Sequence, residues 1–95
     1  MVKLIHRSKD DLPDGGIDER VIWQVPRSHR QPDGIRYRLV HIRKAGELPA
    51  VLYDNHHPKG HHKHLEDTEF PYEFDGLEKL IEDFEKDVEK AYENL

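Results

Sequence analysis

The chain has no cysteine and only one tryptophan and one methionine among its 95 residues. Without cysteine it cannot form a disulfide, a cysteine-ligated zinc ribbon or a thiol nucleophile, and a reducing cytosol is its natural compartment. It also lacks a hydrophobic run long enough to cross a bilayer. Residues 1–10 carry basic side chains among few apolar ones, so we expect no signal peptide. We therefore expect a soluble cytoplasmic protein that does not associate with membranes.

The length of the chain suits one domain with its own core, and we expect residues 1–95 to form it. A core of this size cannot enclose a deep cavity, so an active site would be a shallow groove that suits a polymer or a protein partner. Charge is unevenly distributed: residues 1–64 carry 12 basic and 8 acidic side chains, and residues 65–95 carry 3 basic and 12 acidic. The basic part would attract an anion such as RNA, and the acidic part would repel it.

Branched and aromatic residues at alternate positions predict several β-strands in residues 1–74. The expected strands lie at residues 2–6, 17–25 and 35–43, and a fourth strand ends at residues 51–53. Short turn-forming segments between them favour an antiparallel meander. Trp23 and Tyr37 are most simply core residues on the sheet. The aromatic segment 70–74 would pack beneath the sheet or join its edge.

Residues 75–95 predict one amphipathic helix, with Asp75 as its N-cap. Its polar face would hold the acidic residues, Asp87 among them. The apolar residues of the other face follow helical spacing: Leu77, Leu80, Ile81, Phe84, Val88 and Ala91. The expected fold is therefore α+β. An antiparallel meander of about four to five strands, with a histidine-rich turn, occupies residues 1–74 and packs against this closing helix.

The most informative segment is residues 53–64, where five of the eight histidines fall within nine residues and are interleaved with two lysines. Imidazole titrates near neutral pH, so such a cluster can bind a metal, transfer protons or hold a phosphate. For His56, His57 and His61 a solvated turn without a function is the simplest interpretation.

Metal binding requires three or four ligands that converge on one point. On an extended segment His62 and His64 point to one side and Lys63 to the other. A further ligand would have to come from across the turn, from Asp54, His56 or His57. Because the neighbouring lysines would repel a cation, we expect no metal and no other cofactor, and metal binding remains an alternative.

The same segment fits the cleavage of RNA without a metal. One imidazole removes the proton of the 2′-hydroxyl and the other protonates the leaving 5′-oxygen, and His62 and His64 could take these roles in either order. Basic side chains stabilise the charge that develops on the phosphate, and a glycine allows close approach of the backbone. The residues available for this are Lys59, Lys63, Gly60, Arg36 and Arg38.

Several short motifs follow one another along the chain: Tyr53-Asp54-Asn55, Lys59-Gly60, His62-Lys63-His64 and Pro71-Tyr72-Glu73-Phe74. Together they resemble the TumE family of small prokaryotic proteins, which are toxins of toxin–antitoxin pairs. The resemblance extends to the opening strands and so spans nearly the whole chain. His61 stands where the family often has an acidic residue. The resemblance implies an antitoxin partner, typically a helix-turn-helix DNA-binding protein.

We therefore expect a toxin, and a metal-independent endoribonuclease is the leading hypothesis for its activity. The candidate catalytic residues are His62, His64, Lys59 and Asp54, and the candidate substrate-binding residues are Tyr53, Asn55, Gly60, Lys63, Arg36 and Arg38. One alternative is a toxin that only binds its target, through the acidic helix or the basic loop 27–30. Another is a metal-dependent nuclease that uses the same histidines. An exposed sheet edge would favour a homodimer.

Overall fold

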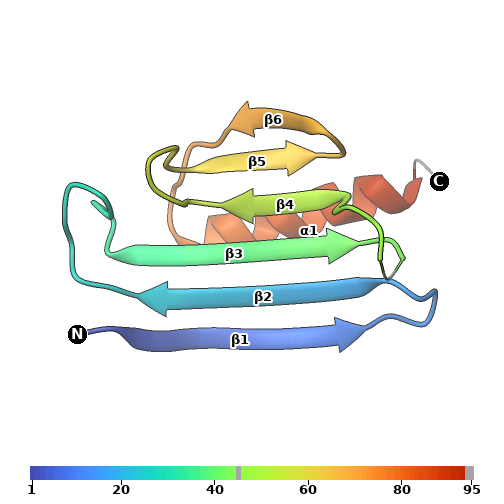
Figure 1. Ribbon diagram of the computed structural model, residues 1–95, viewed down its shortest axis with the longest axis horizontal. Coiled ribbons are helices and arrows are strands. Elements are labelled where there is room, and N and C mark those ends of the chain that lie inside the picture. Colours follow the sequence, from blue (N-terminus) through green and yellow to red (C-terminus); the bar gives the residue numbers. More distant parts are fainter. Residues whose placement is uncertain (45, 94–95) are drawn as a thin grey trace.

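The computed structural model describes residues 1–44 and 46–93, which form one antiparallel sheet and one helix (Figure 1). The strands are β1 (Lys3–Asp11), β2 (Ile17–Gln24), β3 (Ile35–Ile42), β4 (Val51–Asp54), β5 (His62–Leu65) and β6 (Thr68–Pro71), and the helix is α1 (Leu77–Glu93). The strands lie in the sheet in chain order, so the sheet is an open meander with edges at β1 and β6. The predicted α+β fold is confirmed.

The described residues contain six strands, more than the four to five expected. β5 and β6 form a hairpin of mostly polar residues around Glu66 and Asp67, where hydrophobic alternation gives little signal. β1 continues to Asp11 rather than ending at residue 6, because it pairs with β2 along its length. Both faces of this edge strand are largely exposed, so its second half needs no apolar residues.

α1 packs against one face of the sheet and leaves the opposite face without a helix (Figure 1). Its apolar face meets β3 and β4, where Leu39, Tyr53, Leu80 and Phe84 are fully buried. The rings of Tyr53 and Phe84 meet edge to face with their centroids 5.7 Å apart. Burial of each such side chain stabilises the fold by roughly 1.5–3 kcal/mol, so this interface is the core of the domain.

The helix differs from the expectation in two places. It begins at Leu77, and its first hydrogen bond joins the Leu80 amide to the Gly76 carbonyl, so Gly76 rather than Asp75 is the N-cap. Asp87 is buried against the sheet instead of facing solvent, because it accepts hydrogen bonds from Tyr53 and Lys63. Residues 94 and 95, the end of the expected helix, lie outside the described residues. α1 is not long and apolar enough to span a membrane.

Trp23 was expected in the core, but it lies on the other face of β2. Ile22 is the core residue, whereas Val21 and Trp23 point to the helix-free face. Arg20 lies on the same side of β2 as Ile22, and its guanidinium covers the Phe84 ring at 5.2 Å. Tyr37 is a core residue, as expected, and Trp23 is not.

Candidate functional site

The helix-free face collects the histidines of β5 and the arginines of β3. In the sheet register Arg38 is opposite Asp54, and Asp54 is opposite His62. Because alternate residues of a strand share a face and neighbouring strands lie about 4.8 Å apart, these side chains form a row across three strands. The next row holds His64 of β5 and Glu69 of β6, which are direct partners.

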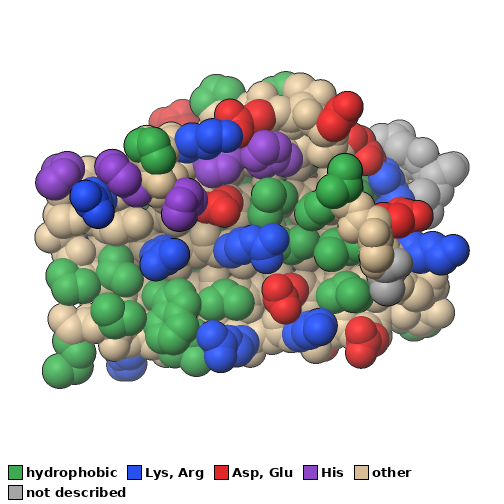
Figure 2. All heavy atoms as spheres, in the orientation of Figure 1, with side chains coloured by type: hydrophobic (Ala, Val, Ile, Leu, Met, Phe, Trp, Pro, Cys, Tyr) green, Lys and Arg blue, Asp and Glu red, His purple; other side chains and the backbone are tan. Residues whose placement is uncertain are grey.

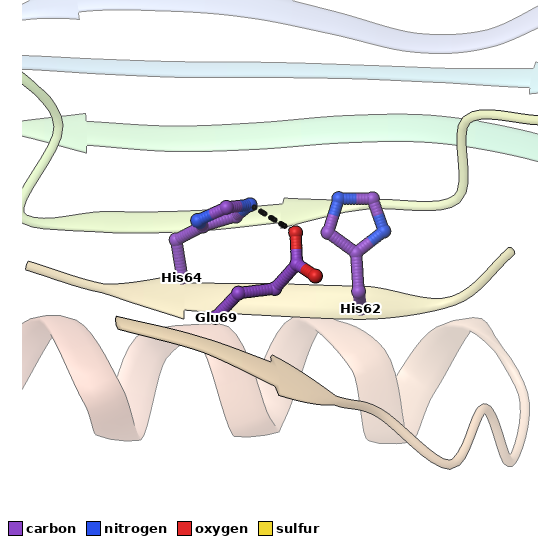
Figure 3. Close-up of side chains that lie close together, drawn as sticks. All are labelled: His62, His64 and Glu69. Carbon is purple, nitrogen blue, oxygen red and sulfur yellow. Dashed lines mark ion pairs between the residues drawn. The ribbon is translucent and has the colours of Figure 1, made fainter. Parts of the chain in front are cut away.

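The side chains of His62, His64 and Glu69 converge above the β5–β6 hairpin (Figure 3). The two imidazole centroids are 5.3 Å apart and the rings are nearly perpendicular. The Glu69 carboxylate lies between them, with Oε1 3.2 Å from His64 Nε2. The predicted placement of both histidines on one side, with Lys63 on the other, is confirmed.

The two histidines have different hydrogen-bond partners. His62 Nδ1 lies 2.8 Å from the Gly60 carbonyl oxygen, which can only accept, so Nδ1 carries the proton. In the neutral tautomer this leaves the lone pair on His62 Nε2. His64 Nε2 faces the Glu69 carboxylate, which favours a proton on that nitrogen. The geometry therefore suits His62 as a proton acceptor and His64 as a proton donor.

Lys59 brings a positive charge to the same site. Its Nζ donates a hydrogen bond of 2.6 Å to Glu69 Oε1. This bond, rather than the nearby histidines, is the main reason that the pKa of Glu69 is lowered below its ordinary value. The Lys59 side chain is 58% exposed, so it can turn from Glu69 toward a bound anion.

A shallow groove of about 620 Å³ lies on the helix-free face, and His56 is among its lining residues. Its walls combine apolar side chains of β2 with basic side chains of β3, chiefly Val21, Trp23, Arg36 and Arg38. In Figure 2, which looks onto this face, histidines and basic side chains lie together across the upper and middle part of the molecule, and a hydrophobic area lies below them on the left. Asp54 lines the groove at the end nearest His62. The groove therefore combines an aromatic side chain with cationic ones, and it approaches the histidine pair through Asp54, the sheet partner of His62.

Three of the candidate substrate-binding residues lie away from this face. Tyr53 is fully buried and donates a hydrogen bond to Asp87. Lys63 lies 3.0 Å from the same carboxylate. Asn55 is buried, where it accepts a hydrogen bond from the Tyr37 amide and donates one of 2.7 Å to the Ile35 carbonyl. These contacts hold the sheet, the helix and the histidine-rich loop together.

The remaining candidates shape the loop that carries the site. Gly60 has a φ of +72°, and its carbonyl accepts the hydrogen bond from His62. Asp54 accepts a hydrogen bond of 2.6 Å from the His56 amide. His61 lies on the other side of the loop, stacked on Phe74 at 4.7 Å and 2.7 Å from Asp33.

The model of the family described as Toxin TumE matches residues 4–92, nearly the whole chain. The chain belongs to the TumE family. It is therefore a toxin of a toxin–antitoxin system, and its partner is an antitoxin. No match was found among curated proteins or among solved structures.

Two residues of the candidate site were not predicted from the sequence. Glu69 joins the histidines because β5 and β6 pair around a two-residue turn, which places it opposite His64. The sequence signal for this pairing was the turn at Glu66 and Asp67, which lies midway between His64 and Glu69. Trp23 was assigned to the core, because its apolar neighbours obscured which face of β2 is covered.

Proposed function

We propose that this toxin is a metal-independent endoribonuclease in which His62 is the general base and His64 the general acid. The observation that supports this most directly is the different environment of the two imidazoles, which face one point of the open sheet surface. A base and an acid of this kind each contribute roughly 10²–10⁴ in rate. The shallow shape of the face suits a polymer substrate.

In the proposed reaction His62 Nε2 takes the proton of the ribose 2′-hydroxyl as the 2′-oxygen attacks the phosphorus. The bond from phosphorus to the 5′-oxygen breaks, and His64, which enters this step as the imidazolium, gives its Nε2 proton to that leaving oxygen and becomes neutral. The products are a 2′,3′-cyclic phosphate and a 5′-hydroxyl end. Ligand atoms of the two imidazoles lie within 4.8 Å of each other, so a group between them is within hydrogen-bond reach of both.

The developing charge on the phosphate needs cationic partners. Lys59 is the nearest, since its ammonium already lies within the histidine cluster on Glu69. Arg38 lies two strands from His62, roughly 10 Å away, and its exposed side chain can hold the backbone next to the cleaved bond. Its ion pair with Glu19, at 3.6 Å, is exposed and contributes little, so the guanidinium remains available to RNA.

The groove supports a single-stranded substrate. An unpaired base can stack on Trp23 while Arg36 and Arg38 hold phosphates. In this scheme Asp54 holds the turn before the histidines instead of transferring a proton. Three further statements remain predictions from the sequence: that the toxin acts in the cytoplasm, that its antitoxin is a helix-turn-helix protein and that it forms a homodimer.

The chemistry of the cleaved ends tests this proposal. A short single-stranded RNA should give a 2′,3′-cyclic phosphate detectable by mass spectrometry. The same oligonucleotide with one 2′-deoxyribose at the cleavage position should stay intact at that bond, because the nucleophile is missing. Cleavage of the deoxy substrate, or products with a 5′-phosphate, would contradict the mechanism.

A further inference from the structure

The β5–β6 hairpin brings a carboxylate to the histidine pair, so that three groups of the kind that bind metal ions lie close together. One ligand atom each from His62, His64 and Glu69 lies within 4.8 Å of the other two. Ligands of a tetrahedral zinc ion lie about 2.0–2.2 Å from the metal, and therefore about 3.4 Å from each other. To bind zinc, the ligand atoms need to move closer to one another by about 1.5 Å at most. Glu69, whose side chain is 42% exposed, has room for this adjustment.

The bond between His62 Nδ1 and the Gly60 carbonyl favours this arrangement. Ligating histidines usually donate their second ring N–H to a carbonyl or a carboxylate, which fixes the ring and directs the free lone pair at the metal. The 2.8 Å contact does this for His62. The His62 residue is only 7% exposed, so its ring is held by its surroundings as well.

Lys59 shows that the position attracts a cation. Its ammonium is bonded to the carboxylate oxygen that also faces His64. This ion pair is at the surface, and pairs of that kind contribute little to stability. A divalent cation that engages two imidazoles and the carboxylate at once would displace the lysine into solvent.

We propose that His62, His64 and Glu69 bind one borderline divalent transition-metal ion, with Zn²⁺ the best match, and that the bound ion blocks RNA cleavage. Two imidazoles and one carboxylate are a ligand set that Zn²⁺ accepts, with a fourth position left for water. Mg²⁺ prefers a shell of oxygen ligands and is not expected to bind. The inhibition rests on the proposed function, because the ion would occupy the nitrogens of both the base and the acid. The binding of the ion does not depend on the proposed function.

Calorimetric titration of the EDTA-treated full-length protein tests the binding without any RNA. We expect one Zn²⁺ per chain and no measurable heat from Mg²⁺. Co²⁺ bound in place of Zn²⁺ should show the visible absorption bands of a cobalt ion with about four ligands. The substitution E69Q should weaken Zn²⁺ binding by at least about tenfold while leaving the circular dichroism spectrum unchanged, because Glu69 is exposed.

Two further variants separate this site from other histidines. K59M should bind Zn²⁺ several-fold more tightly, because the competing ammonium is gone. The matched control H56A/H57A, which removes two exposed neighbouring histidines, should bind as the unmodified protein does. Equal affinities of the unmodified protein and E69Q, or loss of binding in H56A/H57A, would overturn the site.

A cleavage assay over the same Zn²⁺ concentrations tests the inhibition. Cleavage should fall as the site fills and return when EDTA is added. Cleavage that persists with the site filled, or that requires Zn²⁺, would overturn the inhibitory half of the proposal. If the protein cleaves no RNA at all but E69Q loses Zn²⁺, the metal site stands and the proposed nuclease function fails.

Discussion

The hydroxyl of Tyr53 donates a hydrogen bond to the carboxylate of Asp87 in the middle of the helix–sheet interface. Lys63 reaches the same carboxylate from β5. The segment His62-Lys63-His64 therefore has two roles, because strand alternation sends its histidines to the helix-free face and its lysine to the helix. The anchoring of α1 and the position of the histidine pair depend on one short strand.

Replacing Asp87 by Leu should destabilise the fold by about 3 kcal/mol, because it leaves the buried Tyr53 hydroxyl and the Lys63 ammonium without their partner. Urea denaturation followed by circular dichroism measures this. The double variant D87L/K63M should recover part of the loss, since an ion pair replaced by apolar groups of similar size is often nearly neutral. A D87L protein as stable as the unmodified one would show that the interface does not need this network.

A buried histidine outside the candidate site should make stability depend on pH. His41 on β3 is fully buried beside Tyr92, and neither ring nitrogen has a hydrogen-bond partner within residues 1–44 and 46–93. Burial lowers the pKa of His41; Arg43 acts in the same direction, and Asp18 and Asp14 oppose it. The unfolded chain therefore takes up a proton first as the pH falls. The contribution of His41 to stability is complete above about pH 6.5 and decreases below it.

The substitution H41F removes this titration while keeping a ring against Tyr92. Urea denaturation at about pH 7.5 and about pH 5.5 should show a smaller difference in unfolding free energy for H41F than for the unmodified protein. One proton accounts for at most about 1.4 kcal/mol per pH unit, which bounds the expected change in slope. An unchanged slope would mean that His41 does not titrate differently in the two states.

The groove should decide how tightly RNA binds. In a background that cannot cleave, W23A should weaken binding of a single-stranded RNA by about 1–3 kcal/mol, the usual contribution of one stacked base. R36Q and R38Q should each weaken binding. Each should also reduce the number of counterions released on binding, which the salt dependence of the affinity reports, by about one. Fluorescence anisotropy at several salt concentrations measures both. The control K86Q on the helix should leave affinity unchanged; a groove variant that behaves like K86Q would remove that residue from the binding surface.

A substrate with an activated leaving group separates the roles of the two histidines. Such a leaving group departs without a proton, so H64A should cleave an RNA dinucleotide analogue of this kind nearly as fast as the unmodified protein. H62A should remain inactive on it, because the 2′-hydroxyl still needs a base. Stopped-flow release of the leaving group gives both rates. Rescue of H62A instead of H64A would reverse the assignment.

The sequence predicted the fold class and the orientation of the histidine pair because both depend on local periodicity. Alternation along residues 62–64 is enough to separate His62 and His64 from Lys63. Helical spacing likewise placed Leu80 and Phe84 against the sheet.

Features that depend on contacts between distant residues could not be predicted. Glu69 enters the site through pairing of β5 and β6, and Asp87 is buried because two partners from the sheet reach it. Arg20 of β2 lies over the ring of Phe84 in the helix, a contact between residues far apart in the sequence. In each case a polar side chain is placed by its partner rather than by its own pattern.

The most direct test of the proposed mechanism is incubation of the purified protein with mixed RNA in EDTA, beside the variant H62A/H64A. The control H6A/H57A removes two exposed histidines outside the proposed site, and circular dichroism checks that all three proteins fold. The proposed mechanism predicts cleavage by the unmodified protein and by the control, and none by H62A/H64A. Equal cleavage by a folded H62A/H64A, or no cleavage by the unmodified protein in EDTA, would contradict it.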